Sequence, residues 1–370
     1  MSPAPLFIDI HVLQSVPPSN INRDDTGSPK TATYGGVRRA RVSSQAWKRA
    51  TRRAFQDKLD PSTLGVRTKK VVDLIAEHIA SQAEDLGEDA IGLAAGILNA
   101  AGIKTAASSA EANPETGYLL FVSRREASDL AAIAIETHRN GDKPSKKAVS
   151  QVLTGVQGID VALFGRMVAD APDLNTDASA QVAHAISVHA VEPEFDYFTA
   201  VDDRAPEDNA GAGMIGTVEF NSSTYYRYAT LNVPLLEEQL GSAEASARAA
   251  RAFVEAFITS MPTGKQNTFA NRTLPAVAIV QFRSGQPINL VGAFETAVTP
   301  GPDGGYLAKA CSALKDELDQ VDKAYGSPAE RTFVLRLGPK TDPLAGIGEE
   351  VSLAELGNGV ATEVEVRLQS

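Results

Sequence analysis

The first element that the pattern of apolar and polar residues predicts is a strand at Leu6–Val12, where apolar side chains recur at every second position. This alternation is typical of a half-buried strand. The following residues, 14–36, are rich in Pro, Ser, Asn and Gly, and we expect them to form a loop. The segment Ser44–Phe55 contains no Gly or Pro and has Ser43 or Ser44 as its N-cap, which predicts a helix.

The middle of the chain changes to helical spacing. From about Val66 to Met167 the sequence is rich in Ala, with apolar residues recurring at helical positions. Gly and Pro interrupt this pattern near Gly102, at Asn113–Pro114 and at residues 141–144. We therefore expect a mostly helical insertion.

Strand character returns in the second half of the chain. Two extended runs, Ile186–Ala200 and Val218–Tyr228, flank a polar, Gly-rich tip, which predicts a long β-hairpin. A helix at Ala243–Met261 and strands at Ala276–Phe282 and Ile288–Ala293 follow. The order strand, helix, insertion, strands, helix, strand predicts an α+β fold with a split β-α-β core of the ferredoxin or RNA-recognition type.

The helix at Ser44–Phe55 separates apolar from basic residues. At about 100° per residue, one face collects Trp47, Ala50, Thr51, Ala54 and Phe55. The opposite face collects Lys48, Arg49, Arg52 and Arg53. Like charges four residues apart repel by about 0.2–0.5 kcal/mol per pair in an isolated helix, and a bound phosphate backbone would relieve this repulsion. The alternative is a basic face that contacts only solvent.

The charge of the chain reverses locally around this helix. The whole protein has a net charge of −11, whereas residues 23–53 contain nine Lys and Arg against two Asp, a net charge of +7. A basic segment in an acidic chain predicts a polyanionic partner that is held at one place.

Composition limits the cellular setting. With one cysteine, Cys311, the chain can form no intrachain disulfide, and its first residues lack the pattern of a signal peptide. No stretch approaches the roughly 18 uninterrupted apolar residues of a membrane helix, so we expect a cytoplasmic protein with no membrane partner.

The residues that could support catalysis or a cofactor are few. The five histidines show no metal-ligand spacing, and we expect no metal, no cofactor and no catalytic residue. Thr263-Gly264-Lys265 is similar to the end of a phosphate-binding loop but lacks its first Gly and its final Ser or Thr. The pair Asp24-Asp25 could hold Mg²⁺ for phosphoester cleavage, and its alternative is a turn or an ion pair with a neighbouring Arg.

Several strings of residues resemble one known family. They include Asn22-Arg23-Asp24-Asp25, the run from Tyr34-Gly35-Gly36 to Ser43-Ser44-Gln45, and Lys48-Arg49. Further along the chain they are Ala162-Leu163-Phe164-Gly165-Arg166-Met167, Phe198-Thr199-Ala200-Val201-Asp202-Asp203, Tyr226-Arg227-Tyr228-Ala229 and Gly264-Lys265-Gln266-Asn267-Thr268. In this order they resemble the CasC family, the repeated backbone subunit of the type I-E CRISPR Cascade complex. The resemblance weakens after Ala297.

The resemblance implies a hand-like fold. An RNA-recognition (ferredoxin-like) palm would carry a helical fingers insertion and a long β-hairpin thumb. The implied boundaries are 1–60 for the first part of the palm, 61–179 for the fingers, 180–228 for the thumb, and 229–370 for the second part of the palm and the C-terminal tail. Copies of the chain would form a filament along one CRISPR RNA, each thumb displacing every sixth base, and the guide would pair with a target DNA strand.

The resemblance and the basic segment together indicate the interface. The expected RNA-binding residues are Arg23, Lys30, Arg38, Arg41, Ser43, Gln45, Lys48, Arg49, Arg52, Arg166, Met167, Tyr197 and Phe198. Tyr197-Phe198 stands where the family has an aromatic pair beside the displaced nucleotide, although the family residue at the first position is Trp. Lys143, Lys146 and Lys147 are the expected DNA-binding residues, and a solvated junction is their alternative.

We therefore expect a non-catalytic RNA-binding subunit whose partners are CRISPR RNA, target DNA, further copies of itself and other Cascade subunits. Backbone cations and unstacking side chains bind without sequence preference, as a guide holder requires. Two other functions remain open: a metal-dependent ribonuclease backbone subunit that uses Asp24 or Asp25, and a general single-strand RNA chaperone.

Overall fold

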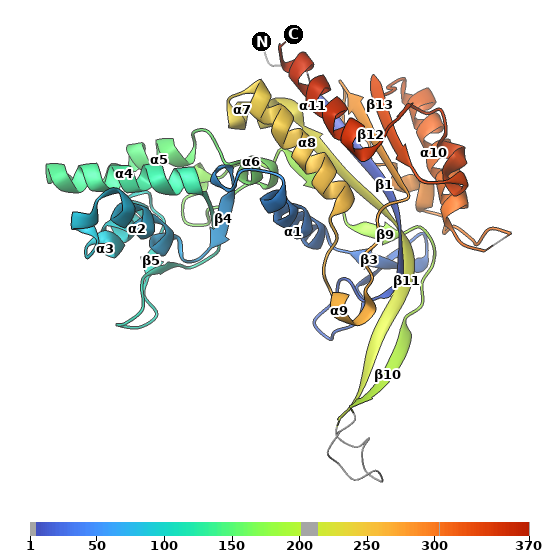
Figure 1. Ribbon diagram of the computed structural model, residues 1–370, viewed down its shortest axis with the longest axis horizontal. Coiled ribbons are helices and arrows are strands. Elements are labelled where there is room, and N and C mark those ends of the chain that lie inside the picture. The colour runs from blue at the N-terminus through green and yellow to red at the C-terminus, as the bar shows by residue number, and fades with distance from the viewer. Residues whose placement is uncertain (1–4, 201–213, 303, 370) are drawn as a thin grey trace. The chain divides into compact units, whose positions relative to one another are not determined.

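The computed structural model describes residues 5–200, 214–302 and 304–369, and the chain divides into two compact units (Figure 1). The sheet unit comprises Met1–Ala54, Val182–Thr230 and Phe253–Val360, and the helical unit comprises Phe55–Gln181, Leu231–Ala252 and Ala361–Ser370. The polar tip of the expected hairpin, residues 202–213, lies outside the described residues. The mixed composition of the two units confirms the α+β class.

The sheet unit is built on one large sheet. Its strands are β1 (Phe7–Ser19), β2 (Thr31–Tyr34), β3 (Val37–Val42), β8 (Ala180–Val182), β9 (Ala185–Ser187), β10 (Glu194–Ala200), β11 (Met214–Asn232), β12 (Val277–Arg283), β13 (Arg331–Arg336) and β14 (Glu349–Glu350). Their order is β14-β13-β12-β1-β11-β9-β3-β2, and β8 and β10 each pair with β11 outside this path. β1 is antiparallel to β12, with Ile10 opposite Val280.

The first strand corrects two expectations. β1 continues to Ser19, and β2 and β3 form a hairpin around Gly35 and Gly36, so residues 14–19 and 31–34 of the expected loop are strand. Both glycines have positive φ (59° and 78°), which suits a two-residue hairpin turn. Nor is β1 half-buried, because Asp9 and His11 are as buried as the apolar residues between them. The polar side chains of this strand therefore lie in the interior, where they form hydrogen bonds.

Helices cover both faces of the sheet. On one face α10 (Leu307–Tyr325) packs Cys311 and Leu314 in a cluster with Val277 and Val334 (Figure 1). On the other face the Arg227 guanidinium of β11 lies 3.7 Å from the Trp47 ring of α1 (Ser44–Ala54) and 4.6 Å from the Phe257 ring of α8 (Ala243–Thr259). This stack attaches α1, the basic helix, to the centre of the sheet.

Two expected strands differ in the structure. Ile186–Ala200 is broken between β9 and β10 just before Glu194, and Pro193, which has no N–H to donate, stands at that break. Ile288–Ala293 is not a strand, because Leu290–Phe294 forms a 3₁₀ helix. Asn289 caps this helix, since its Oδ1 accepts the Val291 N–H.

Three predicted elements are confirmed within two residues. Ser44–Phe55 corresponds to α1, Ala243–Met261 to α8 and Ala276–Phe282 to β12. The remaining helices of this unit are α9 (Gln266–Phe269) and part of α11 (Leu353–Gln369).

The helical unit confirms a mostly helical segment in the middle of the chain. Its helices are α2 (Val71–Gln82), α3 (Ala90–Ala100), α4 (Arg124–Asn140), α5 (Lys146–Leu153), α6 (Ile159–Phe164) and α7 (Val233–Leu240). Two short antiparallel pairs accompany them, β4 (Gly65–Thr68) with β7 (Leu120–Ser123) and β5 (Thr105–Ala106) with β6 (Glu115–Thr116). Ile75, Ile97 and Leu130 pack in its core. In neither unit does a described helix combine the length and apolar character that crossing a membrane requires.

Candidate nucleic-acid interface

Helix α1 presents three stripes of side chains in place of the two expected. Trp47 and Thr51 are buried against the sheet. A second stripe has the helical spacing i, i+3, i+4 and i+7 and consists of Ala46, Arg49, Ala50 and Arg53. Lys48 and Arg52 form the third. The basic residues therefore face two directions from one rigid helix.

The second stripe forms one wall of an open pocket of about 670 Å³, which we name the basic pocket. Its other walls are the loops at 21–27 and 262–265. The cations that line it are Arg23, Arg49, Arg53 and Lys265, and the acids are Asp24 and Asp25. Two of the expected RNA-binding residues, Arg23 and Arg49, thus lie in one concavity.

Several cations in this region have no acidic partner. They differ in this from other exposed cations such as Arg139, which pairs with Asp85 at 3.1 Å, and Arg125, which pairs with Asp129 at 3.8 Å. Among the described residues, no ion pair forms at Arg23, Lys30, Arg38, Lys48, Arg49, Arg53 or Lys265. Lys48 is half-buried, and burial lowers the pKa of its amine. Uncompensated positive charge of this kind attracts an anion.

Arg41 of β3 is a further basic residue beside the start of α1. Arg41 lies 3.3 Å from His184 Nδ1, and the same nitrogen accepts the Ser44 N–H. Burial, and then the charges of Arg41 and Lys30, lowers the pKa of His184 and favours the neutral ring. Ser43 is buried and its hydroxyl accepts the Ala46 N–H, so it acts as the N-cap, while Gln45 is exposed.

Arg39 belongs to the basic segment in sequence but not on the surface. Its guanidinium is buried and donates to the carbonyls of Ser187 at 2.9 Å and Phe294 at 2.8 Å. Arg38, its neighbour in β3, points outward and is exposed. The strand alternation therefore divides two adjacent arginines between core and surface.

The Asp24 carboxylate accepts the hydrogen bonds of a turn. Its Oδ1 accepts the Thr26 N–H at 2.9 Å, the Thr26 hydroxyl at 2.7 Å and the Ser28 N–H at 3.0 Å, and the Thr26 hydroxyl contributes most to lowering its pKa. This geometry favours the turn over a metal site. Among the described residues, no three His, Cys, Asp or Glu side chains gather where they could hold a metal ion.

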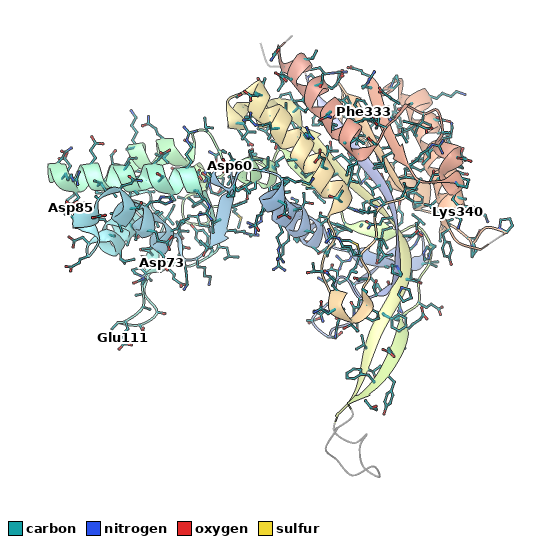
Figure 2. The ribbon with its side chains drawn as sticks, in the orientation of Figure 1. Asp60, Asp73, Asp85, Glu111, Phe333 and Lys340 are labelled. Carbon is teal, nitrogen blue, oxygen red and sulfur yellow. The ribbon has the colours of Figure 1, made fainter. Side chains whose placement is uncertain are left out.

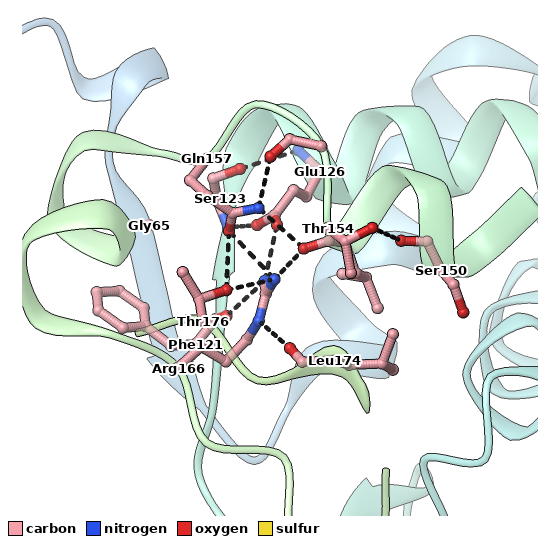
Figure 3. A network of polar contacts seen from close by, with 12 residues as sticks. Gly65, Phe121, Ser123, Glu126, Ser150, Thr154, Gln157, Arg166, Leu174 and Thr176 are labelled. Carbon is pink, nitrogen blue, oxygen red and sulfur yellow. Dashed lines mark hydrogen bonds and ion pairs between the residues drawn. The ribbon is translucent and has the colours of Figure 1, made fainter. Parts of the chain in front are cut away.

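Arg166, one of the expected RNA-binding residues, has its guanidinium fully buried in the helical unit (Figure 3). It pairs with Glu126 Oε1 at 2.7 Å and donates to Gln157 Oε1 at 3.1 Å and to the Leu153 carbonyl. No hydrogen is left for a phosphate without breaking this network. Met167, the next residue, is 73% exposed and free to contact a ligand.

The hairpin of β10 and β11 exposes aromatic rings. Tyr197 and Phe195, two residues apart on one face of β10, are each 64% exposed. Phe198 points to the other face, where its ring covers Gly216 of the paired strand, and a Cβ at Gly216 would lie 2.4 Å from it. Tyr197 is thus free to stack on a base, while Phe198 also braces the hairpin.

The lysines expected to bind DNA lie in the helical unit. Lys143, Lys146 and Lys147 are exposed at the start of α5. Lys146 pairs with Asp173 at 3.1 Å, an exposed contact that contributes little stability. Two acidic residues of the same unit are Asp73 on α2 and Asp85 in the 3₁₀ helix Glu84–Leu86 that follows it (Figure 2).

Lys265 and Arg53 are not among the expected RNA-binding residues, and the structure places both in the basic pocket. Lys265 lies more than 200 residues from α1 in the chain. Two local signals contained it: the fragment Thr263-Gly264-Lys265, which fails as a phosphate-binding loop, and the string Gly264-Lys265-Gln266-Asn267-Thr268, which resembles the family. Arg53 carried a signal, the i+4 spacing from Arg49.

Comparisons with known proteins agree with this geometry. The sequence model of the CT1975-like protein family matches residues 8–359. A solved chain described as "CRISPR RNA-guided surveillance complex, pre-nicking" is 35% identical, with a TM-score of 0.86 over 97% of this chain and 100% of that one. A second, described as "CRISPR RNA-guided surveillance complex", is 29% identical, with a TM-score of 0.63 over 96% and 99%. No curated protein sequence gave a significant match. The chain belongs to the CT1975-like family, and is a member of the CasC group of Cascade backbone subunits whose motifs it carries.

Proposed function

We propose that this chain is a non-catalytic subunit that binds CRISPR RNA, polymerises along the guide and presents it for pairing with target DNA. The proposal is carried by five cations on and around α1 that form no ion pair with another described residue, in a chain whose net charge is −11: Arg23, Lys48, Arg49, Arg53 and Lys265. Cations that contact phosphates bind every sequence alike, which a guide holder needs, because base pairing supplies the specificity.

The fold supports assignments for the parts of the hand. If the elements between them are left aside, six elements come in the order β-α-β-β-α-β of a ferredoxin-like or RNA-recognition palm: β1, α1, β9, β11, α8 and β12. We assign the thumb to the β10–β11 hairpin and the fingers to the helices from α2 to α6. Tyr197 would stack on the displaced base, Met167 would contact neighbouring bases, and Lys143 and Lys147 would contact the target DNA strand.

The test replaces two cations that leave α1 in different directions. Lys48→Glu/Arg49→Glu should abolish retention of RNA during purification while the protein stays folded, because neither residue belongs to the buried stripe of Trp47 and Thr51. Each lost phosphate contact should reduce the slope of log K against log salt by about 0.7 for single strands. Lys315→Glu/Lys323→Glu on α10 makes the same change of charge away from α1 and should retain RNA. A Lys48/Arg49 variant that purifies with the normal amount of RNA would contradict the proposal.

The ribonuclease alternative depends on Asp24 or Asp25. The three hydrogen bonds that Asp24 accepts support a role in the turn, so Asp24→Ala should leave guide-directed DNA binding in place. Incubation of the assembled complex with complementary RNA and Mg²⁺ separates the two functions. A ladder of cuts that disappears in Asp24→Ala or Asp25→Ala would replace the non-catalytic assignment with the enzyme.

A further inference from the structure

A further group of cations lies in the helical unit, at the N-terminal end of α2, and we name it the α2 basic patch. Its members are Arg67, Lys69, Lys70 and Lys104, and all four are exposed. None of them forms an ion pair with another residue that the structure describes. Asp73, in the first turn of α2, instead accepts the Asn113 Nδ2 at 2.8 Å. The positive charge of the patch is therefore uncompensated.

Backbone pairing brings these cations together beside an exposed leucine. β4 leads into Lys69, whose carbonyl accepts the Thr116 N–H at 3.0 Å. Thr116 is paired with Thr105, the residue after Lys104. The pairing of β4 with β7 places Leu119, which is 49% exposed, next to Lys69. The patch thus combines positive charge with an apolar side chain.

The two lysines before α2 stand where the helix itself favours acids. Lys70 is the N-cap residue of α2 and makes no side-chain cap hydrogen bond, and Lys69 precedes it. The N-terminus of a helix carries a partial positive charge, which repels cations and stabilises carboxylates. Both lysines therefore weaken the helix in the isolated chain. A partner that supplies negative charge would offset this effect.

Negative charge gathers at the other end of the same helix, around Asp85 (Figure 2). The 12 residues of α2 span about 18 Å. Beyond them lie three exposed acids, which form no ion pair with another described residue and which we name the acidic turn: Glu84, Glu88 and Asp89. Next to this turn Ile91 is only partly buried, and a Cβ at Gly92 would meet no atom within 4 Å. An apolar side chain can approach there.

We propose that the α2 basic patch binds the acidic turn of a second copy of this chain, so that the helical units of successive copies are joined in series. Every copy carries both surfaces and the two differ, which makes the contact heterologous, and a heterologous contact that does not close on itself produces a filament. This inference rests on the proposed function, in which copies follow one another along the guide.

The exposed leucine favours a protein partner over a nucleic acid. A phosphate backbone is bound through cations alone. The α2 basic patch also exposes Leu119, which fits the open surface at Ile91 and Gly92, while the opposite charges surround this contact. An apolar centre with a charged rim is typical of interfaces between proteins.

The experiment compares binding of one copy with binding of several. The full-length protein is titrated onto fluorescent RNA that is long enough for one copy and onto RNA that is long enough for several, and native mass spectrometry counts the copies. Lys69→Glu/Lys70→Glu should keep wild-type affinity for the short RNA. On the long RNA it should reduce the cooperativity between copies by about tenfold or more, because like charges then face each other. It should melt no lower than wild type, since carboxylates suit the N-terminus of α2.

Exchange of the charges provides the matched test. Glu84→Lys/Glu88→Lys should lose cooperativity as Lys69→Glu/Lys70→Glu does. The fourfold variant that combines both pairs should recover it, because its two surfaces again carry opposite charges. Lys315→Glu/Lys323→Glu on α10, outside the helical unit, should keep wild-type cooperativity.

Three outcomes would overturn the inference. Wild-type cooperativity in Lys69→Glu/Lys70→Glu, or no recovery in a fourfold variant that melts as wild type does, would overturn the contact between copies and leave RNA binding intact. A loss of affinity for the short RNA in Lys69→Glu/Lys70→Glu would assign the patch to nucleic acid. Absence of binding to either RNA by wild type would overturn the proposed function together with this inference.

Discussion

His11 is an ionisable side chain buried at the centre of the sheet. Its Nδ1 lies 2.9 Å from the Tyr226 hydroxyl, and its ring packs 5.3 Å from the Tyr228 ring. Burial, followed by the charge of Arg283, lowers its pKa from 6.5 to about 3. The neighbouring Asp9 pairs with Arg283 at 3.3 Å and accepts the Tyr228 hydroxyl at 2.7 Å. The neutral ring is therefore the form that the fold accommodates.

The stability of the sheet unit should depend on pH through His11. Because the folded pKa is depressed, the unfolded chain binds more protons between pH 3 and 6.5, so stability is lost as pH falls below 6.5. At pH 5 the loss amounts to about 2 kcal/mol, at 1.36 kcal/mol per pH unit. His11→Phe should lose less stability than wild type between pH 7 and pH 5 in urea unfolding.

A matched control is available at His138, which is exposed at the end of α4. His138→Gln should keep the wild-type dependence on pH. His189, whose pKa burial also lowers, should account for part of the change that remains in His11→Phe. An unchanged loss in His11→Phe would show that His11 is not the group responsible.

At the scale of elements, Arg166 joins three parts of the helical unit. Glu126 Oε2 accepts the Ser123 N–H at 2.6 Å in the capping box of α4, and its Oε1 accepts from Arg166. Arg166 also donates to the carbonyls of Leu153, at the end of α5, and Leu174 (Figure 3). One guanidinium therefore connects the start of α4, through Glu126, with the carbonyl of Leu153 at the end of α5.

Arg166→Met should destabilise the protein by about 3–5 kcal/mol, because it leaves the Glu126 carboxylate buried without its partner. The double variant Arg166→Met/Glu126→Gln should recover part of this loss, since a Gln at this position can still cap Ser123. Thermal and urea unfolding measure both effects. A single variant as stable as wild type, or a double variant less stable than the single, would contradict this role.

Arg166 also illustrates how far elements could be predicted from sequence. The helices α1 and α8 and the strand β12 follow from local periodicity, and α1 has a stripe of Trp47 and Thr51 that becomes the core. Local pattern could not show that Arg166 is enclosed, because its partners lie up to 45 residues away in the chain. Lys265 was missed for the same reason, since the Gly264 contact with Ile21 exists only in three dimensions.

At the scale of the whole molecule, the proposed filament makes the hairpin the part that repeats along the guide. Tyr197 is exposed, whereas Phe198 rests on Gly216, so the two rings of the aromatic pair have different environments. The interruption of the strand at Pro193 separates this hairpin from the sheet strand β9. The hairpin therefore projects as an element whose apolar side chains have few partners of their own.

Replacing both aromatic residues tests the hairpin in every copy at once. Tyr197→Ala/Phe198→Ala removes a ring whose stacking on a base contributes about 1–3 kcal/mol. Chemical probing of the guide in the assembled complex should show reactivity at every sixth nucleotide with wild type and a blurred pattern with this variant. Phe195→Ala, which removes an equally exposed ring from the same strand, should keep the wild-type pattern. An unchanged pattern in the double variant would assign the displacement elsewhere, and Met167, 73% exposed, would then be the residue to replace.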